Sequence, residues 1–229
     1  SLIEEIVAWM RSQTERREAA GALVGLSGGI DSATTAGLVK KAFGDNALGV
    51  LLPSSGTIND DVRYGHLTAE TFGLKTVEVN IESMYNAFAS AFDGLDIPTV
   101  ERKFWPQTSV PTSNPEYQNV SVRLRMMALY HIAEKMNYVV MGTSNKSEII
   151  TGYYTIYGDA GTDMRPLGDF YNTEVREVAK KIGVPQEIID RPSSGGCRGE
   201  EDDLDEYEFG VDYETLDKIH MAMMQGEKL

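Results

Sequence analysis

The octapeptide Gly25–Ser32, which reads Gly-Leu-Ser-Gly-Gly-Ile-Asp-Ser, constrains this chain more than any other stretch. The apolar run Ala22–Val24 before it predicts a buried strand, and apolar residues at helical spacing from Ala33 to Phe43 predict a helix after it. A strand that turns through glycines into a helix leaves free backbone N–H groups at the helix N-terminus, where the helix dipole adds positive charge. The octapeptide therefore predicts a loop that binds phosphate groups.

The side chains of this octapeptide suit the same ligand. Gly28 and Gly29 let the backbone approach a phosphate and permit positive φ. Ser27 and Ser32 add hydroxyl groups, and Asp31 supplies a carboxylate oxygen for Mg²⁺. The pattern is neither the Walker motif nor Gly-x-Gly-x-x-Gly. An ordinary glycine turn is the alternative, but the complete octapeptide directly after a strand favours a phosphate loop.

The order of the expected elements indicates an α/β fold. Apolar runs predict strands at 22–24, 46–52, 75–81 and 138–141. Helical spacing predicts helices at 2–17, 33–43, 82–92, 119–136, 173–182 and 213–224, with short ones after 145 and from 185. Asn59 or Asp60 could cap a further helix that runs to about residue 72. This alternation predicts a doubly wound, mostly parallel sheet flanked by helices, in which ligands bind at the carboxyl ends of the strands.

Two segments interrupt the alternation. Residues 94–118 hold four prolines and little periodicity, so we expect a long excursion over the surface. Residues 193–210 carry a run of acidic residues and predict a mobile loop. No internal repeat is visible, and the 229 residues are expected to form one domain over 1–229.

Composition excludes several classes of partner. A formal net charge of −14 argues against a nucleic-acid surface, which needs a basic stripe. No apolar run approaches the roughly 18 residues of a membrane span. The single cysteine, Cys197, cannot form an internal disulfide and fits a reducing cytoplasm. We therefore expect a cytoplasmic protein that acts on small molecules, without a nucleic-acid or membrane partner.

Several further motifs occur in register with the phosphate loop. They are Asn-Val-Ser-Val-Arg-Leu-Arg-Met at 119–126, Gly-Thr-Ser-Asn-Lys-Ser-Glu at 142–148, the glycine-rich and aspartate-rich stretch 152–163, and Pro-Leu-Gly-Asp at 166–169. With Ser-Gly-Gly-Ile-Asp-Ser at 27–32, this order resembles the ammonia-dependent NAD synthetases. These enzymes belong to the N-type ATP pyrophosphatases, and the resemblance implies their adenine nucleotide alpha hydrolase-like fold. It extends from about residue 25 to 217.

The resemblance implies an ATP-dependent carbon–nitrogen ligase. The carboxylate of nicotinate adenine dinucleotide would attack the α phosphate of ATP and release pyrophosphate. Ammonia would then displace AMP and give the amide, NAD. Such a reaction needs positioning and charge neutralisation more than a strong base, because the substrate carboxylate is itself the nucleophile.

Carried over position by position, the resemblance also implies a set of site residues. The catalytic pair and Mg²⁺ ligands would be Asp31 and Glu148, and the acceptor nucleotide would meet Arg123 and Asp163. Glu148 as a solvated helix charge and Arg123 as the partner of a surface acid are the alternatives. The residues expected to contact ATP are Gly25, Leu26, Ser27, Gly28, Gly29, Ile30, Asp31, Ser32, Thr143, Ser193 and Ser194.

The acceptor end departs from the family pattern. Ile156 stands where the family has a lysine for the acid dinucleotide, and Asn172 where a lysine reaches ATP. The sequence ends at Leu229 without the His-Lys pair that the family places over the substrate. A different carboxylate, such as nicotinate mononucleotide, is therefore an alternative acceptor. A sulfur-transferring ATP pyrophosphatase using Cys197 and a nucleotide-binding protein without turnover are further alternatives.

The resemblance also implies partners. Family members are homodimers with sites near the interface, so a homodimer is expected. No segment resembles a glutaminase, which leaves free ammonia or a separate glutaminase as the nitrogen source. The substrates expected are ATP, ammonia and a nicotinate-containing nucleotide or another small carboxylate, with Mg²⁺ as the cofactor.

Overall fold

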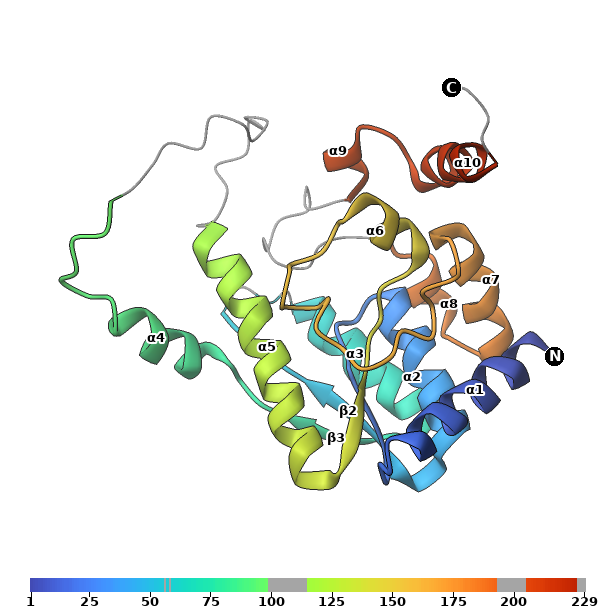
Figure 1. The fold of residues 1–229 in the computed structure, drawn as a ribbon, viewed down its shortest axis with the longest axis horizontal. Coiled ribbons are helices and arrows are strands. Elements are labelled where there is room, and N and C mark those ends of the chain that lie inside the picture. The colour runs from blue at the N-terminus through green and yellow to red at the C-terminus, as the bar shows by residue number, and fades with distance from the viewer. Residues whose placement is uncertain (56, 58, 99–114, 193–204, 226–229) are drawn as a thin grey trace.

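The computed structural model describes residues 1–229 except 56, 58, 99–114, 193–204 and 226–229 (Figure 1). Within that part, four strands form one sheet in the order β3-β2-β1-β4, and every neighbouring pair is parallel. The strands are β1 (Gly21–Gly25), β2 (Ala47–Leu51), β3 (Lys75–Glu78) and β4 (Tyr138–Met141). The octapeptide thus leaves the sheet from a central strand.

Helices connect these strands and cover them. In the described part of the chain, none is long and apolar enough to cross a membrane. They are α1 (Leu2–Arg16), α2 (Ile30–Phe43), α3 (Asn59–Phe72), α4 (Glu82–Ser90), α5 (Pro115–Met136), α6 (Lys146–Thr151), α7 (Asn172–Ile182), α8 (Gln186–Ile189), α9 (Asp205–Phe209) and α10 (Tyr213–Met224), with a 3-10 turn, η1, at Gly44–Asn46.

Strands β1, β2 and β4 are buried, whereas β3 at one edge of the sheet is exposed. Successive residues point to opposite faces of the sheet, so each buried strand contributes to both apolar clusters. On β1, Ala22 and Val24 join the apolar cluster that α1, α2 and α7 cover, whereas Leu23 joins the cluster under α5. The same alternation separates Met141 from Val140 on β4. A parallel sheet with helices on both faces confirms the doubly wound α/β fold expected from the sequence.

Two expected loops are shorter than predicted. Helix α5 begins at Pro115 instead of residue 119, because proline suits the first position of a helix, where its missing N–H would have no partner. Helix α9 lies inside the acidic segment 193–210. The remainder of that segment, 193–204, is outside the described residues, as is the middle of the excursion, 99–114. That 1–229 is one domain stays a prediction.

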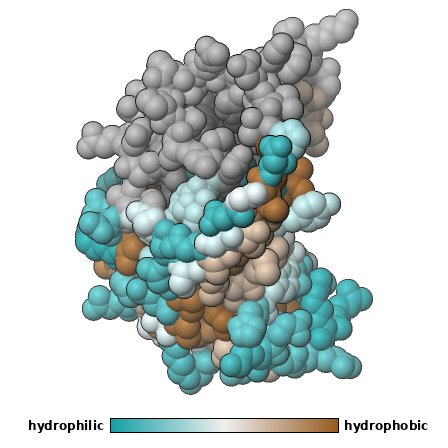
Figure 2. Space-filling view, turned by 90° about the vertical axis from the view of Figure 1, so that its left-hand side faces the viewer, coloured by the Kyte–Doolittle hydropathy of each residue, from teal (hydrophilic) through white to brown (hydrophobic). Residues whose placement is uncertain are grey.

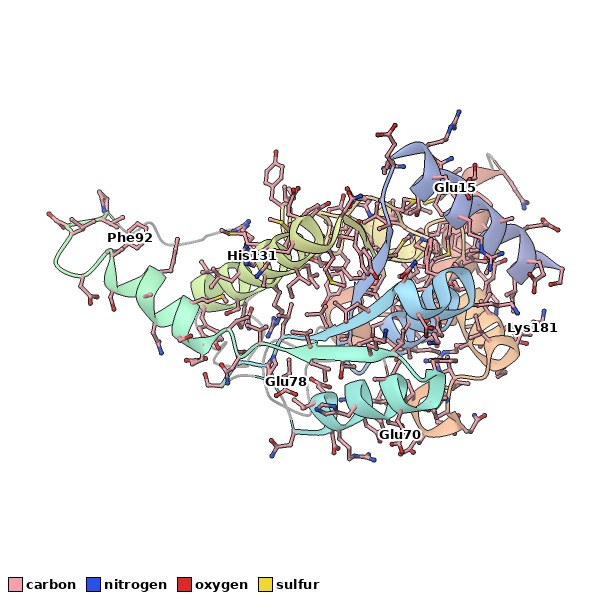
Figure 3. All side chains as sticks on the ribbon, turned by 90° about the horizontal axis from the view of Figure 1, so that it is seen from below. Glu15, Glu70, Glu78, Phe92, His131 and Lys181 are labelled. Atoms are coloured by element: carbon pink, nitrogen blue, oxygen red, sulfur yellow. The ribbon has the colours of Figure 1, made fainter. Side chains whose placement is uncertain are left out.

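Helix α4 projects from the body of the fold at the left of Figure 1. None of its residues is buried, and Phe92, just beyond its end, lies far out on this arm (Figure 3). The arm carries several large apolar side chains that are exposed: Met84, Phe88, Phe92, Leu95 and Ile97. Figure 2 views this side of the molecule and shows hydrophobic residues among hydrophilic ones. An exposed apolar surface of this kind is typical of a contact with another protein.

Candidate active site

The turn from β1 into α2 has the shape expected of a phosphate loop. Gly28 has a φ of +85°, which favours glycine, and a Cβ there would overlap the backbone carbonyl of Asp61. Gly29 is the N-cap of α2, so the first N–H groups of that helix come directly after it. The sequence predicts that Gly28 lets a phosphate approach the backbone. In the structure, the group that approaches Gly28 closely is the first turn of α3.

Both serines of the octapeptide hold the loop in shape. The Ser32 hydroxyl donates to the Gly29 carbonyl at 2.9 Å and lies 3.1 Å from Ser27 Oγ. The Ser27 N–H also points at Ser32 Oγ, at 3.3 Å. Ser32 is buried, whereas Ser27 is exposed at the mouth of the loop. Ser32 therefore shapes the loop from inside, and the side chain of Ser27 lies on its exposed side.

Asn145 joins the phosphate loop to the segment that follows β4. Its side-chain amide donates to Asp31 Oδ1 at 3.2 Å, and its backbone N–H donates to Glu148 Oε2 at 3.0 Å. Its side-chain oxygen accepts from the Glu148 N–H at 3.0 Å, which completes a capping box on α6. Because β1 and β4 are neighbours in the sheet, both predicted carboxylates lie at the same edge, with a fully buried asparagine between them.

Burial and mutual repulsion disfavour the charged forms of this pair. Burial raises the pKa of Asp31 to about 6, and the charge of Asp205 contributes. Burial and the charge of Asp31 raise the pKa of Glu148 well above its usual range, again with a contribution from Asp205. Asp205 opens α9 and accepts a hydrogen bond from the Tyr213 hydroxyl at 2.8 Å. The site thus concentrates negative charge that a cation would relieve.

The donor set fits Mg²⁺ that arrives with phosphate groups. Among the residues that the structure describes, no three His, Cys, Asp or Glu side chains form a group that could hold a metal ion. Mg²⁺ seldom needs such a group, since it keeps several waters and is usually held by one or two carboxylates together with substrate phosphates. Asp31 and Glu148 beside a phosphate loop match that requirement.

A buried carboxylate from the C-terminal helix supports α6. Asp217 of α10 accepts hydrogen bonds from the Ser147 hydroxyl, and from the N–H and hydroxyl of Thr173 at 3.0 and 2.8 Å. Ser147 Oγ in turn accepts from the N–H of Asn172 at 3.0 Å. Helix α10 therefore ties together the N-terminal turns of α6 and α7, over which it lies in Figure 1. The position of Glu148, next to Ser147, depends on this junction.

The two residues expected at the acceptor end make their contacts away from the carboxylate pair. Arg123 is on the surface, and its Nε donates to the Ile156 carbonyl at 3.1 Å. Asp163 accepts from the Val140 N–H at 2.8 Å. Burial, with the charge and hydrogen bond of Asp163, raises the pKa of Tyr130 to about 12. Arg123 thus supports the turn that carries Ile156, whereas Asp163 fastens its segment to β4.

Of the other residues that the sequence singled out, the structure describes some and leaves others undescribed. Thr143 is half-buried between β4 and α6, close in sequence to Asn145. Ile156 is 59% exposed, and Asn172 is buried at the start of α7. Ser193, Ser194 and Cys197 lie outside the described residues.

Sequence reasoning missed Asn145 and Asp217 as parts of the site. The spacing Asn145-x-x-Glu148 is a capping-box signal, so the sequence did contain a clue to the first. Nothing local marks Asp217, because its partners Ser147 and Thr173 are 70 and 44 positions away.

Comparison with known proteins gives a consistent result. The family model described as NAD synthase matches residues 2–229. An NH(3)-dependent NAD(+) synthetase of Methanocaldococcus jannaschii is 42% identical over 99% of this chain and 82% of its own length. One of Alkaliphilus oremlandii is 39% identical over 95% and 83%. The solved structure of an NMN synthetase from Francisella tularensis superposes with a TM-score of 0.84 at 30% identity, covering 100% of this chain and 86% of that one.

The raised pKa of Asp31 predicts how stability responds to pH. Between its ordinary pKa of 3.8 and about 6, the folded chain binds more protons than the unfolded chain, so the free energy of unfolding falls as pH rises through this range. In metal-free buffer, D31N should therefore be more stable than wild type at pH 8, by up to about 3 kcal/mol for a shift of this size, and the gain should vanish near pH 4. Urea unfolding at pH 4, 6 and 8 measures it.

Asp212 offers a control of opposite sign. It caps α10 and its pKa is lowered by the hydrogen bond from the Thr215 N–H, so D212N should bring no gain at pH 8. A D31N variant less stable than wild type at pH 8 would contradict the electrostatic description of the site.

Proposed function

Because this chain belongs to the NAD synthase family, we propose that Asp31, Asn145 and Glu148 mark the place where it uses ATP to convert a nicotinate carboxylate into an amide. Membership makes the chain a carbon–nitrogen ligase of NAD biosynthesis that takes ATP and ammonia as substrates. The observation that carries the assignment of the site is the hydrogen bond between Asn145 and Asp31. It brings the phosphate loop and the carboxylate of Glu148 to one sheet edge, where doubly wound folds bind ligands.

In this proposal the chain promotes the reaction mainly by positioning the substrates and by neutralising the charge of the phosphates. The N–H groups at the start of α2 receive the triphosphate, and the helix dipole favours its negative charge. Asp31 and Glu148 would hold Mg²⁺, which would supply positive charge to offset the negative charge of the triphosphate. The nicotinate carboxylate attacks the α phosphorus and pyrophosphate leaves. Ammonia then attacks the acyl adenylate, AMP leaves, and the amide remains.

No side chain has to act as the nucleophile in this scheme. The substrate carboxylate itself forms the new bond to phosphorus. The remaining ATP contacts, among them Thr143, Ser193 and Ser194, are proposed on the family resemblance. Arg123 and Asp163 are proposed for the acceptor nucleotide on the same ground.

Glu148 and Glu174 allow a matched test of the site. Both are the third residue of a helix and accept a hydrogen bond from the backbone of their N-cap, but only Glu148 lies beside Asp31. We expect E148Q to lower the rate of AMP and pyrophosphate formation by at least about 100-fold, because the positive charge held at the phosphates is lost. E174Q should stay within about twofold of wild type, as surface substitutions usually do.

Coupled assays for pyrophosphate and AMP, at several Mg²⁺ concentrations, make this measurement. Equal rates for E148Q and wild type at limiting Mg²⁺ would reject Glu148 as a metal ligand and with it the proposed site.

Nicotinate adenine dinucleotide is the proposed acceptor, and nicotinate mononucleotide is the second candidate. The named relatives of 39 and 42% identity are NAD synthetases and favour the first. The structural neighbour from F. tularensis is an NMN synthetase, which favours the second. The exposed Ile156 in place of the family's lysine also removes a cation that a dinucleotide would meet.

Comparing kcat/KM for the two acids, with ammonium and ATP saturating, decides between the candidates. We expect the dinucleotide to be preferred by at least about tenfold, the ratio that 1.4 kcal/mol of binding free energy gives. A reversed ratio would assign the chain to the mononucleotide reaction. Pyrophosphate release that needs a sulfide donor and ignores ammonium would contradict both.

We also propose that the chain acts as a homodimer in the cytoplasm and uses free ammonia. The exposed apolar side chains of the α4 arm support a contact with a second copy, and the single cysteine suits a reducing compartment. The relatives named NH(3)-dependent support ammonia as the direct nitrogen source, so a separate glutaminase is not required.

Sedimentation equilibrium tests the dimer. We expect a mass of two chains for wild type and a shift toward the monomer for the double variant F88S/F92S, because each polar replacement removes buried apolar surface worth about 2 kcal/mol or more. I150S changes an exposed apolar side chain outside the arm and serves as the control. A wild-type monomer at micromolar concentration would contradict the proposal.

A further inference from the structure

Arg191, just beyond α8, reaches both α3 and the phosphate loop. Its Nη2 lies 2.6 Å from Asp61 Oδ1, and its Nη1 donates to the Gly28 carbonyl at 3.4 Å. The side chains of Arg191 and Asp61 are only 19% and 7% exposed. The guanidinium group therefore bridges a buried carboxylate and the backbone of the loop.

Asp61 meets the same glycine from another direction. A Cβ on Gly28 would overlap the Asp61 carbonyl, so the first turn of α3 packs directly on the loop. Burial raises the pKa of Asp61, and the hydrogen bond and charge of Arg191 oppose that rise. The pair thus encloses Gly28, and removing the guanidinium would leave a buried acid without its cation.

Holding the Gly28 carbonyl has a consequence for the next residue. The peptide unit is planar, so the direction of the Gly28 C=O fixes the direction of the Gly29 N–H on its other side. That N–H lies 3.4 Å from Ser27 Oγ, at the mouth of the loop. The Arg191 contact therefore influences the direction in which the Gly29 N–H of the loop points.

Arg63 provides an internal comparison. Both guanidinium groups lie over the ring of Tyr64, with Cζ 4.1 Å from the ring centroid for Arg63 and 5.0 Å for Arg191. Arg63 pairs with Asp60 and Glu187 at 3.4 and 3.3 Å, but it is 53% exposed. Exposed pairs of this kind contribute little, so Arg63 reproduces the stacking and the charge without the contact to the loop.

We propose that Arg191 is a positioning residue that sets the phosphate loop for ATP through its bridge between Asp61 and the Gly28 carbonyl. The proposal rests on the function assigned above to the loop. Arg191 acts on ATP through the loop, so its loss raises the KM for ATP and leaves the KM for ammonium unchanged.

Four variants of the full chain test this role. R191K keeps a positive charge beside Asp61 but cannot span both partners, because a lysine has no fork of donors. D61N/R191M removes both buried charges together, so the fold is not left with an unpaired acid. R191M alone measures that penalty by urea unfolding. R63M is the matched control.

The readouts are the affinity for a nonhydrolysable ATP analogue with Mg²⁺, measured by calorimetry, and kcat and KM for ATP and ammonium. We expect R191K and D61N/R191M to bind the analogue about tenfold more weakly, the effect of losing a hydrogen bond from a charged group. R63M should stay within about twofold of wild type. The KM for ammonium should not move in any variant.

The possible results distinguish a failure of the positioning role of Arg191 from a failure of the proposed function. If wild type binds the analogue and both R191K and D61N/R191M bind it equally well, the positioning role is wrong and the function of the site stands. An equal rise in the KM for ATP and for ammonium would also overturn it, because that pattern indicates general damage. If wild type fails to bind the analogue, the proposed function fails and the role of Arg191 fails with it.

Discussion

The candidate site depends on one hydrogen-bonded asparagine that joins two neighbouring strand ends. Asn145 donates through its side chain to Asp31 and through its backbone to Glu148, so a single buried residue sets the separation of two carboxylates. An asparagine suits this place because its side-chain NH₂ donates to Asp31 while its side-chain oxygen accepts the N–H of Glu148. The helix cap of α6 and the geometry of the proposed cation site are therefore the same set of contacts.

The two buried carboxylates of the candidate site lower the stability of the folded chain when they are charged. Burial raises the pKa of Asp31 and Glu148, so the folded chain is less stable with both ionised than with both neutral. Contacts in the surrounding structure hold these elements in place. Asp217 draws α6 and α7 together through three hydrogen bonds, and the Arg191–Asp61 pair encloses the phosphate loop. Perturbed acids held by a rigid shell are typical of functional sites.

The two halves of the site differ in how firmly the chain defines them. On the ATP side, glycine conformation, helix capping and buried pairs all act on one loop. On the proposed acceptor side, Arg123 supports a turn in which Ile156 and Tyr157 are exposed, and Tyr157 has a positive φ of 60°. A surface of this kind contributes fewer fixed donors.

The sequence alone determined the fold class, and it predicted the phosphate loop and the two carboxylates, because strand and helix periodicity and the Ser-Gly-Gly-Ile-Asp-Ser motif are local patterns. It also placed α10 and β4 at their observed bounds. Only the tertiary structure decided that Asn145 links the carboxylates, that Asp217 supports α6 and that Arg191 reaches Gly28. These contacts join residues between 44 and 163 positions apart, apart from the cap within α6. Such pairings depend on the order of the strands in the sheet and on which residues are buried, and neither can be read from a short stretch of sequence.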